Sequence, residues 1–130
     1  MESLSAMADQ LASSAGGLDA TLLLRAETAL EELLSNSIAH GGAQDVEGAT
    51  VGLSVTARSD GLLLCYEDSF AAFDPMAKID EALRRTTNPM DQRPLGGLGL
   101  LMVFRMADEF RYRRQGERNC IDLLFAERRP

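Results

Sequence analysis

Residues 30–40 read LEELLSNSIAH, and this stretch decides how we expect the surrounding chain to fold. Its leucines recur at helical spacing, which indicates an amphipathic helix with one apolar side against a core. Asp19 is typical of a residue that caps the start of a helix, and Gly41-Gly42 is typical of a stop. We therefore expect a helix from Asp19 to about His40. Its expected apolar stripe consists of Leu23, Ala26, Leu30, Leu33, Leu34 and Ile38.

The segments on either side of this helix carry equally regular patterns. Residues 2–15 have apolar residues at helical spacing and predict a first helix. Residues 50–58 alternate between apolar and small or polar side chains, and residues 62–66 are apolar throughout. The turn sequence Ser59-Asp60-Gly61 separates these two runs, so they predict a β-hairpin whose second strand is central in a sheet.

The C-terminal half predicts two more helices and a closing hairpin. Asp74-Pro75 opens a short helix to about Leu83, followed by a polar loop over residues 84–95. From Gly99 to Phe110 the pattern is helical again. Two strands, over residues 110–114 and 119–127, complete the chain. This order predicts an α/β two-layer sandwich: one domain over residues 1–130, with a mixed, mainly antiparallel sheet and helices on one face.

The composition excludes several classes of function. Residues 1–83 carry 14 acidic and 3 basic side chains, whereas residues 84–130 carry 6 acidic and 10 basic ones, all of them arginine. The acidic half and the lack of aromatic residues among the arginines argue against nucleic-acid binding. No apolar run has the length of a membrane span, and the first residues do not resemble a signal peptide. We expect a cytoplasmic protein with no membrane or direct nucleic-acid partner.

One side of the helix that ends near His40 carries a polar trio. Glu32, Asn36 and His40 follow one another in steps of four residues, which places them on one face beside the apolar stripe. An amide oxygen can ligate Mg²⁺, and a carboxylate one turn away can act as a general base. The alternative is an ordinary polar face, with His40 complementing the C-terminal end of the helix.

Two further segments carry residues suited to ligand binding. Asp68 follows the predicted central strand, where its carboxylate can accept a hydrogen bond from a ligand amine or cap its own turn. Gly96, Gly97 and Gly99 come directly before and within the start of a helix. Bare backbone N–H groups at that positive end form a cradle for an anion, best suited to phosphate. The alternative is a tight loop that permits close packing.

Taken in order, these segments resemble the motifs of the GHKL ATPase superfamily, which has the Bergerat ATP-binding fold. Glu32, Asn36 and His40 match its N box, Asp68 opens its G1 box, and Gly97-Leu98-Gly99 matches its G2 box. Within the superfamily the sequence is most similar to the bacterial anti-sigma-factor serine kinases, the RsbW-like proteins. That similarity also includes residues 73–75 and 106–110, together with Gly116 and Asn119. It spans about residues 18–126.

The resemblance implies an enzyme that uses ATP and Mg²⁺ and forms ADP. It implies that Glu32 is the catalytic base, that Asn36 holds Mg²⁺ and that Asp68 receives the adenine amine. Residues 84–95 would form the ATP lid. The implied partners are a STAS-domain anti-anti-sigma factor, whose serine is phosphorylated, and a sigma factor in the alternative state; a homodimer is also compatible with this family. The nucleotide contacts that the resemblance implies are Asn36, His40, Asp68, Phe73, Gly96, Gly97, Leu98, Gly99 and Leu100.

Two departures from the family pattern leave an alternative open. Phe70 stands where the G1 box has glycine, and its ring cannot adopt a positive φ cheaply. It either stacks on the base or fills the pocket. The predicted first element is a helix, whereas family members open with a strand. A degenerate module that binds a STAS or sigma partner without nucleotide is therefore the second hypothesis. A detached histidine-kinase catalytic domain is disfavoured, because His40 is the only histidine.

Overall fold

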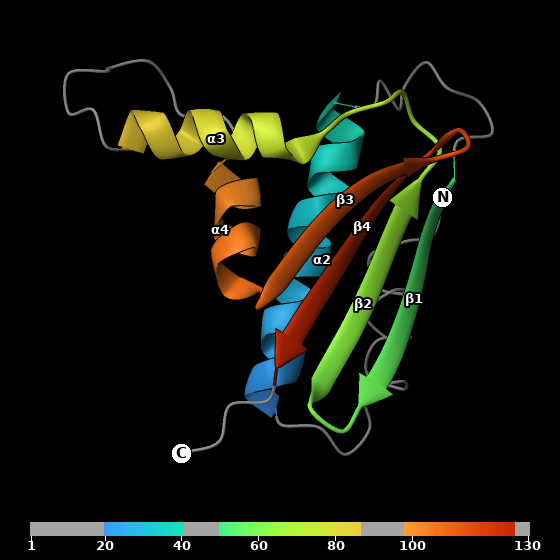
Figure 1. The fold of residues 1–130 in the computed structure, drawn as a ribbon, viewed down its shortest axis with the longest axis vertical. Coiled ribbons are helices and arrows are strands. Elements are labelled where there is room, and N and C mark those ends of the chain that lie inside the picture. Colours follow the sequence, from blue (N-terminus) through green and yellow to red (C-terminus); the bar gives the residue numbers. More distant parts are fainter. Residues whose placement is uncertain (1–19, 41–49, 87–97, 127–130) are drawn as a thin grey trace.

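The computed structural model describes residues 20–40, 50–86 and 98–126. Four strands form one antiparallel sheet in the order β1-β2-β4-β3, so β2 and β4 are central (Figure 1). The predicted α/β architecture is confirmed, and the predicted N-terminal helix over residues 2–15 lies outside the described residues. The elements in chain order are α2 (Ala20–His40), β1 (Val51–Arg58), β2 (Gly61–Asp68), α3 (Pro75–Thr86), α4 (Leu98–Met106), β3 (Glu109–Gln115) and β4 (Arg118–Ala126).

The first hairpin forms as predicted, with β2 in the centre. Every second residue of β2, from Leu62 through Leu64 to Tyr66, is almost completely buried on the side that faces the helices. Gly61 begins the strand at a φ of 154°, and a β-carbon there would overlap the carbonyl oxygen of Phe125 on β4. Glycine is therefore required at this close approach of two central strands.

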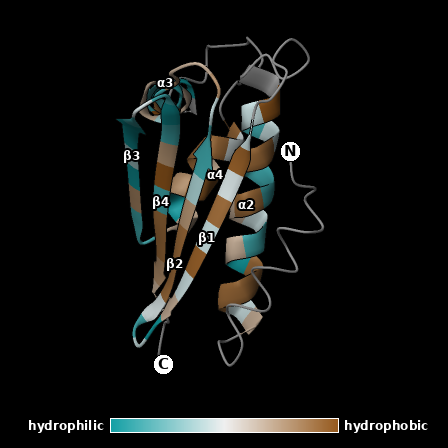
Figure 2. Ribbon diagram, turned by 90° about the vertical axis from the view of Figure 1, so that its right-hand side faces the viewer, coloured by the Kyte–Doolittle hydropathy of each residue, from teal (hydrophilic) through white to brown (hydrophobic). Residues whose placement is uncertain are grey.

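The described helices form a layer on one side of the sheet. α2 and α4 pack against each other and α2 lies along the sheet, while α3 crosses the end of α4 (Figures 1 and 2). No described helix covers the opposite side, which we call the open face. None of the described helices is long and apolar enough to cross a membrane. One face of the sheet thus carries the core, and the helix layer carries the candidate site residues of α2 and α4.

The apolar stripe of α2 is correct in its middle and wrong at its C-terminal end. Leu30, Leu33 and Leu34 are buried, but Ile38 is 47% exposed. The neighbouring Ser37 is buried instead, because it hydrogen-bonds Tyr66 and Asp68 on the sheet. Since each residue turns the helix by about 100°, the inward position of Ser37 directs Ile38 outward.

Two predicted helix ends also differ from the structure. α3 continues to Thr86, so residues 84–86 are helical rather than loop; residues 87–95 of the expected lid lie outside the described residues. α4 ends at Met106, whose carbonyl accepts a hydrogen bond from Arg25, and Asp108 N then donates to Leu124 O at 2.8 Å.

Phe110, expected as the last residue of that helix and the first of the next strand, lies in β3. Its ring meets that of Phe104 edge to face at 5.8 Å between centroids. The apolar periodicity of this segment therefore reflects packing between a helix and the following strand rather than one long helix.

Candidate functional site

The polar side of α2 faces two different neighbours along its length. Glu32 is half-buried and lies against Gly99 at the start of α4. One turn further on, Asn36 is half-buried and lines a small cavity that α2 shares with the ends of β2 and β4. Glu32 on this face thus lies against a glycine of the predicted anion cradle, and Asn36 lines the same cavity as Asp68.

Asp68, at the end of β2, is the buried acceptor of this cavity, with 6% of its surface exposed. Its Oδ2 accepts a hydrogen bond from Ser37 Oγ at 2.7 Å, and its Oδ1 accepts one from Asn119 Nδ2 at 2.8 Å. The backbone N–H of Phe70 also donates to Oδ1, at 3.2 Å, and forms the turn-capping bond considered from the sequence. A carboxylate has about four acceptor positions, so one remains for a further donor.

Ser37 links Asp68 to the core of the sheet. The Ser37 hydroxyl lies 2.8 Å from the hydroxyl of Tyr66. Because the single Ser37 proton is donated to Asp68, the Tyr66 hydroxyl must be the donor in this contact. Burial raises the pKa of Tyr66, so its proton stays in place over the physiological range. Tyr66, Ser37 and Asp68 therefore form a fixed chain of donors that ends on the carboxylate.

Asn119 on β4 fixes the loop that follows Asp68. Its side-chain nitrogen also donates to Ala71 O at 2.9 Å, and its Oδ1 accepts from Phe73 N at 3.1 Å and from the Tyr112 hydroxyl at 2.9 Å. Arg114 supports the same loop by donating to Phe70 O at 2.8 Å. The closing hairpin thus positions both Asp68 and residues 70–73.

Phe70 occupies the space beside Asp68. Its side chain is 2% exposed and belongs to the main hydrophobic core. No described residue other than glycine has a positive φ, so the loop accepts phenylalanine without the left-handed conformation that the sequence led us to question. Of the two placements considered, the ring fills the pocket.

The cavity that remains has a volume of about 20 Å³. That volume holds a single water molecule, whereas pockets for small-molecule ligands measure roughly 300–1,000 Å³. The cavity as it stands is therefore too small for a purine base. The described walls of the cavity are formed by Leu33, Asn36, Ser37, Asp68, Phe70, Ala71, Phe73, Asn119 and Ile121.

The oxygen donors of α2 suit a cation that a ligand brings with it. Among the described residues, no group of three or more His, Cys, Asp or Glu side chains could hold a metal ion. The amide of Asn36 supplies one oxygen at the cavity, while the carboxylate of Glu32, one turn away, lies against Gly99. Mg²⁺ is commonly held by one or two such groups together with phosphate oxygens and water, so these residues fit a cation bound with a phosphorylated ligand.

The remaining predicted site residues do not line the cavity in the part of the chain that the structure describes. Leu98 begins α4 and is exposed, while Leu100 is buried in the core and offers no side chain to a ligand. Gly96 and Gly97 lie outside the described residues, as does the side chain of His40. Asn36, Asp68 and Phe73 are therefore brought together at one cavity, and Glu32 and Gly99 at a second contact.

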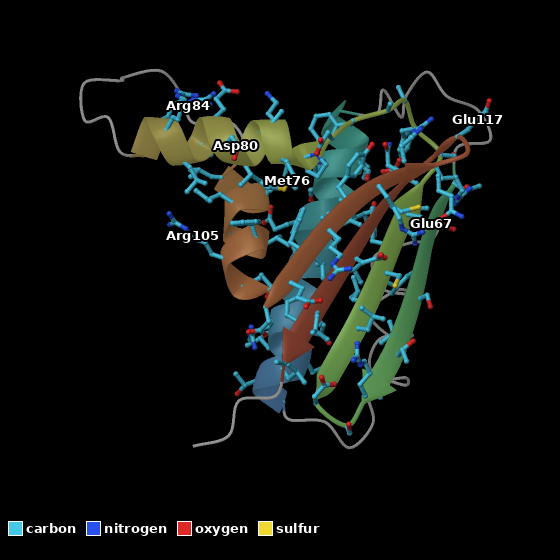
Figure 3. The ribbon with its side chains drawn as sticks, in the orientation of Figure 1. Glu67, Met76, Asp80, Arg84, Arg105 and Glu117 are labelled. Atoms are coloured by element: carbon cyan, nitrogen blue, oxygen red, sulfur yellow. The ribbon has the colours of Figure 1, made fainter. Side chains whose placement is uncertain are left out.

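The open face carries both cysteines but no activated thiol. Burial, together with the hydrogen bond and charge of Asp122, raises the pKa of Cys65 to about 11. Burial likewise raises the pKa of Cys120, whose thiol donates to Glu67 Oε2 at 3.9 Å. Arg118 pairs with the same glutamate at 3.2 Å, and Figure 3 shows Glu67 on β2. Protonated thiols are poor nucleophiles, so neither cysteine is activated for attack.

Sequence reasoning missed Ser37 as a site residue and gave Asn119 no role. Both are buried polar residues, and each hydrogen-bonds Asp68. Ser37 could have been found as the small polar residue beside Asn36 on a helix that is otherwise apolar toward the core. The contact of Asn119 depends on the register in which it pairs with Asp68 across β2 and β4.

Comparison with known protein families gives a match over most of the chain. Residues 1–125 match the family model of the histidine kinase-like ATPase domain. The match covers α2, the G1-type loop after β2, α4 and all but the last residue of β4, so it includes the elements that carry the described site. No curated protein matches the chain.

Proposed function

The chain belongs to the histidine kinase-like ATPase family, and on this premise we propose that it is an ATP-dependent serine protein kinase and anti-sigma factor. Its substrate in this proposal is a serine of a STAS-domain antagonist, and a sigma factor is the partner in the alternative state. The observation that carries the proposal is the meeting of Asn36 and Asp68 at one cavity, with Glu32 one turn away against Gly99. Family membership alone supports only an ATP-binding, kinase-like ATPase.

Each of these residues has a distinct role in phosphoryl transfer. Asp68 has one free acceptor position, which suits the exocyclic amine of adenine once the Phe70 ring has moved aside. Asn36 offers an amide oxygen to Mg²⁺, which supplies positive charge to the phosphate oxygens when bound. The serine oxygen attacks the γ-phosphorus, its proton passes to the Glu32 carboxylate, and the bond to the β-phosphate oxygen breaks to release ADP.

The composition argues against a phosphate acceptor histidine within this chain. His40 is the only histidine of the chain and falls in the N-box position, so the chain has no second histidine to receive phosphate. The partners that we propose act on transcription inside the cell, which corresponds to the expected cytoplasmic location. A homodimer remains part of the proposal.

Binding of Mg-ATP is the first expected result. A site with a Kd near 10 μM, held at about 1 mM nucleotide, stabilises the native state by about 2.7 kcal/mol and raises the melting temperature. Thermal shift and calorimetry with Mg-ATP and Mg-ADP measure this directly, with Mg²⁺ alone as the control. A melting temperature that does not change at millimolar nucleotide contradicts the kinase proposal.

A second candidate function is favoured by the burial of Phe70. A module that has the same fold but binds only a STAS or sigma partner needs no room for an adenine base. The cavity of about 20 Å³ is compatible with such a module. This candidate also explains why a large apolar side chain is tolerated at a position where the family uses glycine.

Phe70→Gly separates the two candidates. If the ring restricts a working nucleotide site, the variant binds Mg-ATP at least tenfold more tightly in calorimetry, because the bound base no longer has to displace it. The variant also loses stability, about 3–5 kcal/mol for removal of a buried phenyl ring. Phe104→Ala removes a half-buried ring elsewhere and controls for destabilisation. Binding in neither wild type nor Phe70→Gly favours the partner-binding module.

A further inference from the structure

We propose that Gly99 is a positioning residue for Glu32: its missing side chain leaves the space in which the Glu32 carboxylate is held beside the start of α4. This rests on the proposed function, in which Glu32 is the general base. It assigns to Gly99 a task different from contact with phosphate, which the motif resemblance implied. The contact joins the two helices that pack together in the layer behind the sheet.

The backbone of Gly99 does not require glycine. Among the described residues only Gly61 and Gly116 have a positive φ, so an alanine could adopt the conformation of Gly99 without strain. Gly99 is also the second residue of α4, and within a helix alanine is much the better helix former. Local conformational preference therefore argues for alanine at this position, and a tertiary reason for glycine is needed.

That reason is the position of the Glu32 side chain. A β-carbon built on Gly99 would overlap Oε2 of Glu32 and lie 3.0 Å from its Cδ. These are the nearest atoms to the added carbon, and both belong to the end of a flexible side chain. An alanine therefore collides with the carboxylate rather than with the backbone of α2.

The two helices cannot move apart to relieve this collision. Leu33, next to Glu32 in sequence, is 1% exposed, and Leu100 and Leu101, which follow Gly99, are each 3% exposed. Their burial in a close-packed core fixes both helices, whereas the Glu32 side chain can rotate. The Gly99→Ala substitution thus displaces the carboxylate and leaves the fold intact.

The positive end of α4 favours a carboxylate at the position that Gly99 leaves open. The first turn of a helix presents unpaired N–H groups and partial positive charge, and α4 has no acidic residue of its own in that turn. Glu32 supplies the negative charge from α2. An orientation fixed in this way is what a general base needs to meet an incoming hydroxyl.

A double-mutant cycle with Gly99→Ala, Glu32→Ala and the double variant tests the proposal. With Glu32 present, Gly99→Ala is expected to lower kcat for serine phosphorylation at least 100-fold and to leave the Kd of Mg-ATP within about threefold. In the Glu32→Ala background it causes no further loss of kcat, because the displaced group is already absent.

Gly52→Ala is the matched control. A β-carbon at Gly52, on β1, would lie 3.1 Å from Oε1 of Glu67, so it also crowds a glutamate carboxylate, on the open face and less closely than at Gly99. This variant is expected to leave kcat unchanged. A fall in kcat equal to that of Gly99→Ala would mean that the kinetic effect is unspecific and would overturn the proposal.

Melting temperatures of the same four proteins keep the outcome separate from that of the proposed function. Gly99→Ala raises the melting temperature by a few degrees in the Glu32→Ala background and by clearly less when Glu32 is present. An equal shift in both backgrounds contradicts the contact, and so does a tenfold loss of Mg-ATP affinity with kcat preserved. If the wild type binds no nucleotide, the proposed function fails, while the melting temperatures still decide whether Gly99 makes room for Glu32.

Discussion

Glu32→Gln is expected to lower the rate of serine phosphorylation by about 10²–10⁴-fold at saturating Mg-ATP, with the Kd of Mg-ATP within about threefold of wild type. Glutamine has the size of glutamate and fits the space beside Gly99, so the contact between α2 and α4 remains. It cannot accept the proton of the attacking hydroxyl. The loss therefore appears in kcat, as for an interaction made only in the transition state.

The adjacent Glu31 provides the control for this variant. Glu31 is exposed, and as the preceding residue of α2 it points about 100° away from Glu32 around the helix. Glu31→Gln makes the same change of charge and is expected to leave both kcat and affinity unchanged. Phosphorylation is measured by transfer of radiolabelled γ-phosphate to the STAS partner under single-turnover conditions. If Glu32→Gln weakens nucleotide binding and spares kcat, Glu32 positions the ligand and is not the base.

The residues that recur with a local period could be predicted from the sequence. Glu32 and Asn36 share a face because the helix repeats every 3.6 residues, and the structure places both at the inner side of α2. Asp68 could be placed at the end of a central strand because the run before it is apolar on both faces. These predictions needed no knowledge of what packs against what.

The partners of these residues could not be predicted in the same way. Whether Ser37 or Ile38 faces the sheet depends on the rotation of α2, which the Tyr66 and Asp68 hydrogen bonds decide. Asn119 meets Asp68 only through the register of β2 and β4. These contacts depend on tertiary packing, which the short-range periodicity of the sequence does not predict.

Phe70 illustrates the same point from the opposite side. The family pattern has glycine at this position, and a phenylalanine could not adopt a positive φ there without strain. The sequence therefore indicates a conflict in the backbone of the loop. The structure removes this conflict with a loop that has no positive φ at this residue and a core that takes up the ring. Phe70 therefore reduces the volume of the cavity and does not strain the backbone.

Asp68→Asn carries the second large expected effect. The carboxylate accepts hydrogen bonds from Ser37, Asn119 and the N–H of Phe70, and an asparagine in its place must turn an NH₂ group toward at least one of these donors. A buried donor left facing another donor costs about 1–3 kcal/mol. We expect a loss of that size in the free energy of unfolding, measured by urea denaturation.

In the proposed kinase, the same substitution also reverses the polarity offered to adenine. The amine of the base donates, and the substituted amide would offer at most one oxygen, already occupied by other donors. Calorimetry is expected to show Mg-ATP affinity reduced by roughly 100-fold, equivalent to about 2.7 kcal/mol. Asp74→Asn is the control, because Asp74 is exposed and caps α3 through Met76 N at 2.9 Å, a bond that asparagine makes equally well.

These two measurements together distinguish the candidate functions. Both candidates require the loss of stability, because the network around Asp68 positions the loop over residues 70–73 in either case. Only the kinase requires the loss of nucleotide affinity. An Asp68→Asn protein that is destabilised as expected but binds Mg-ATP as wild type does would show that the carboxylate serves the fold and that the base is recognised elsewhere.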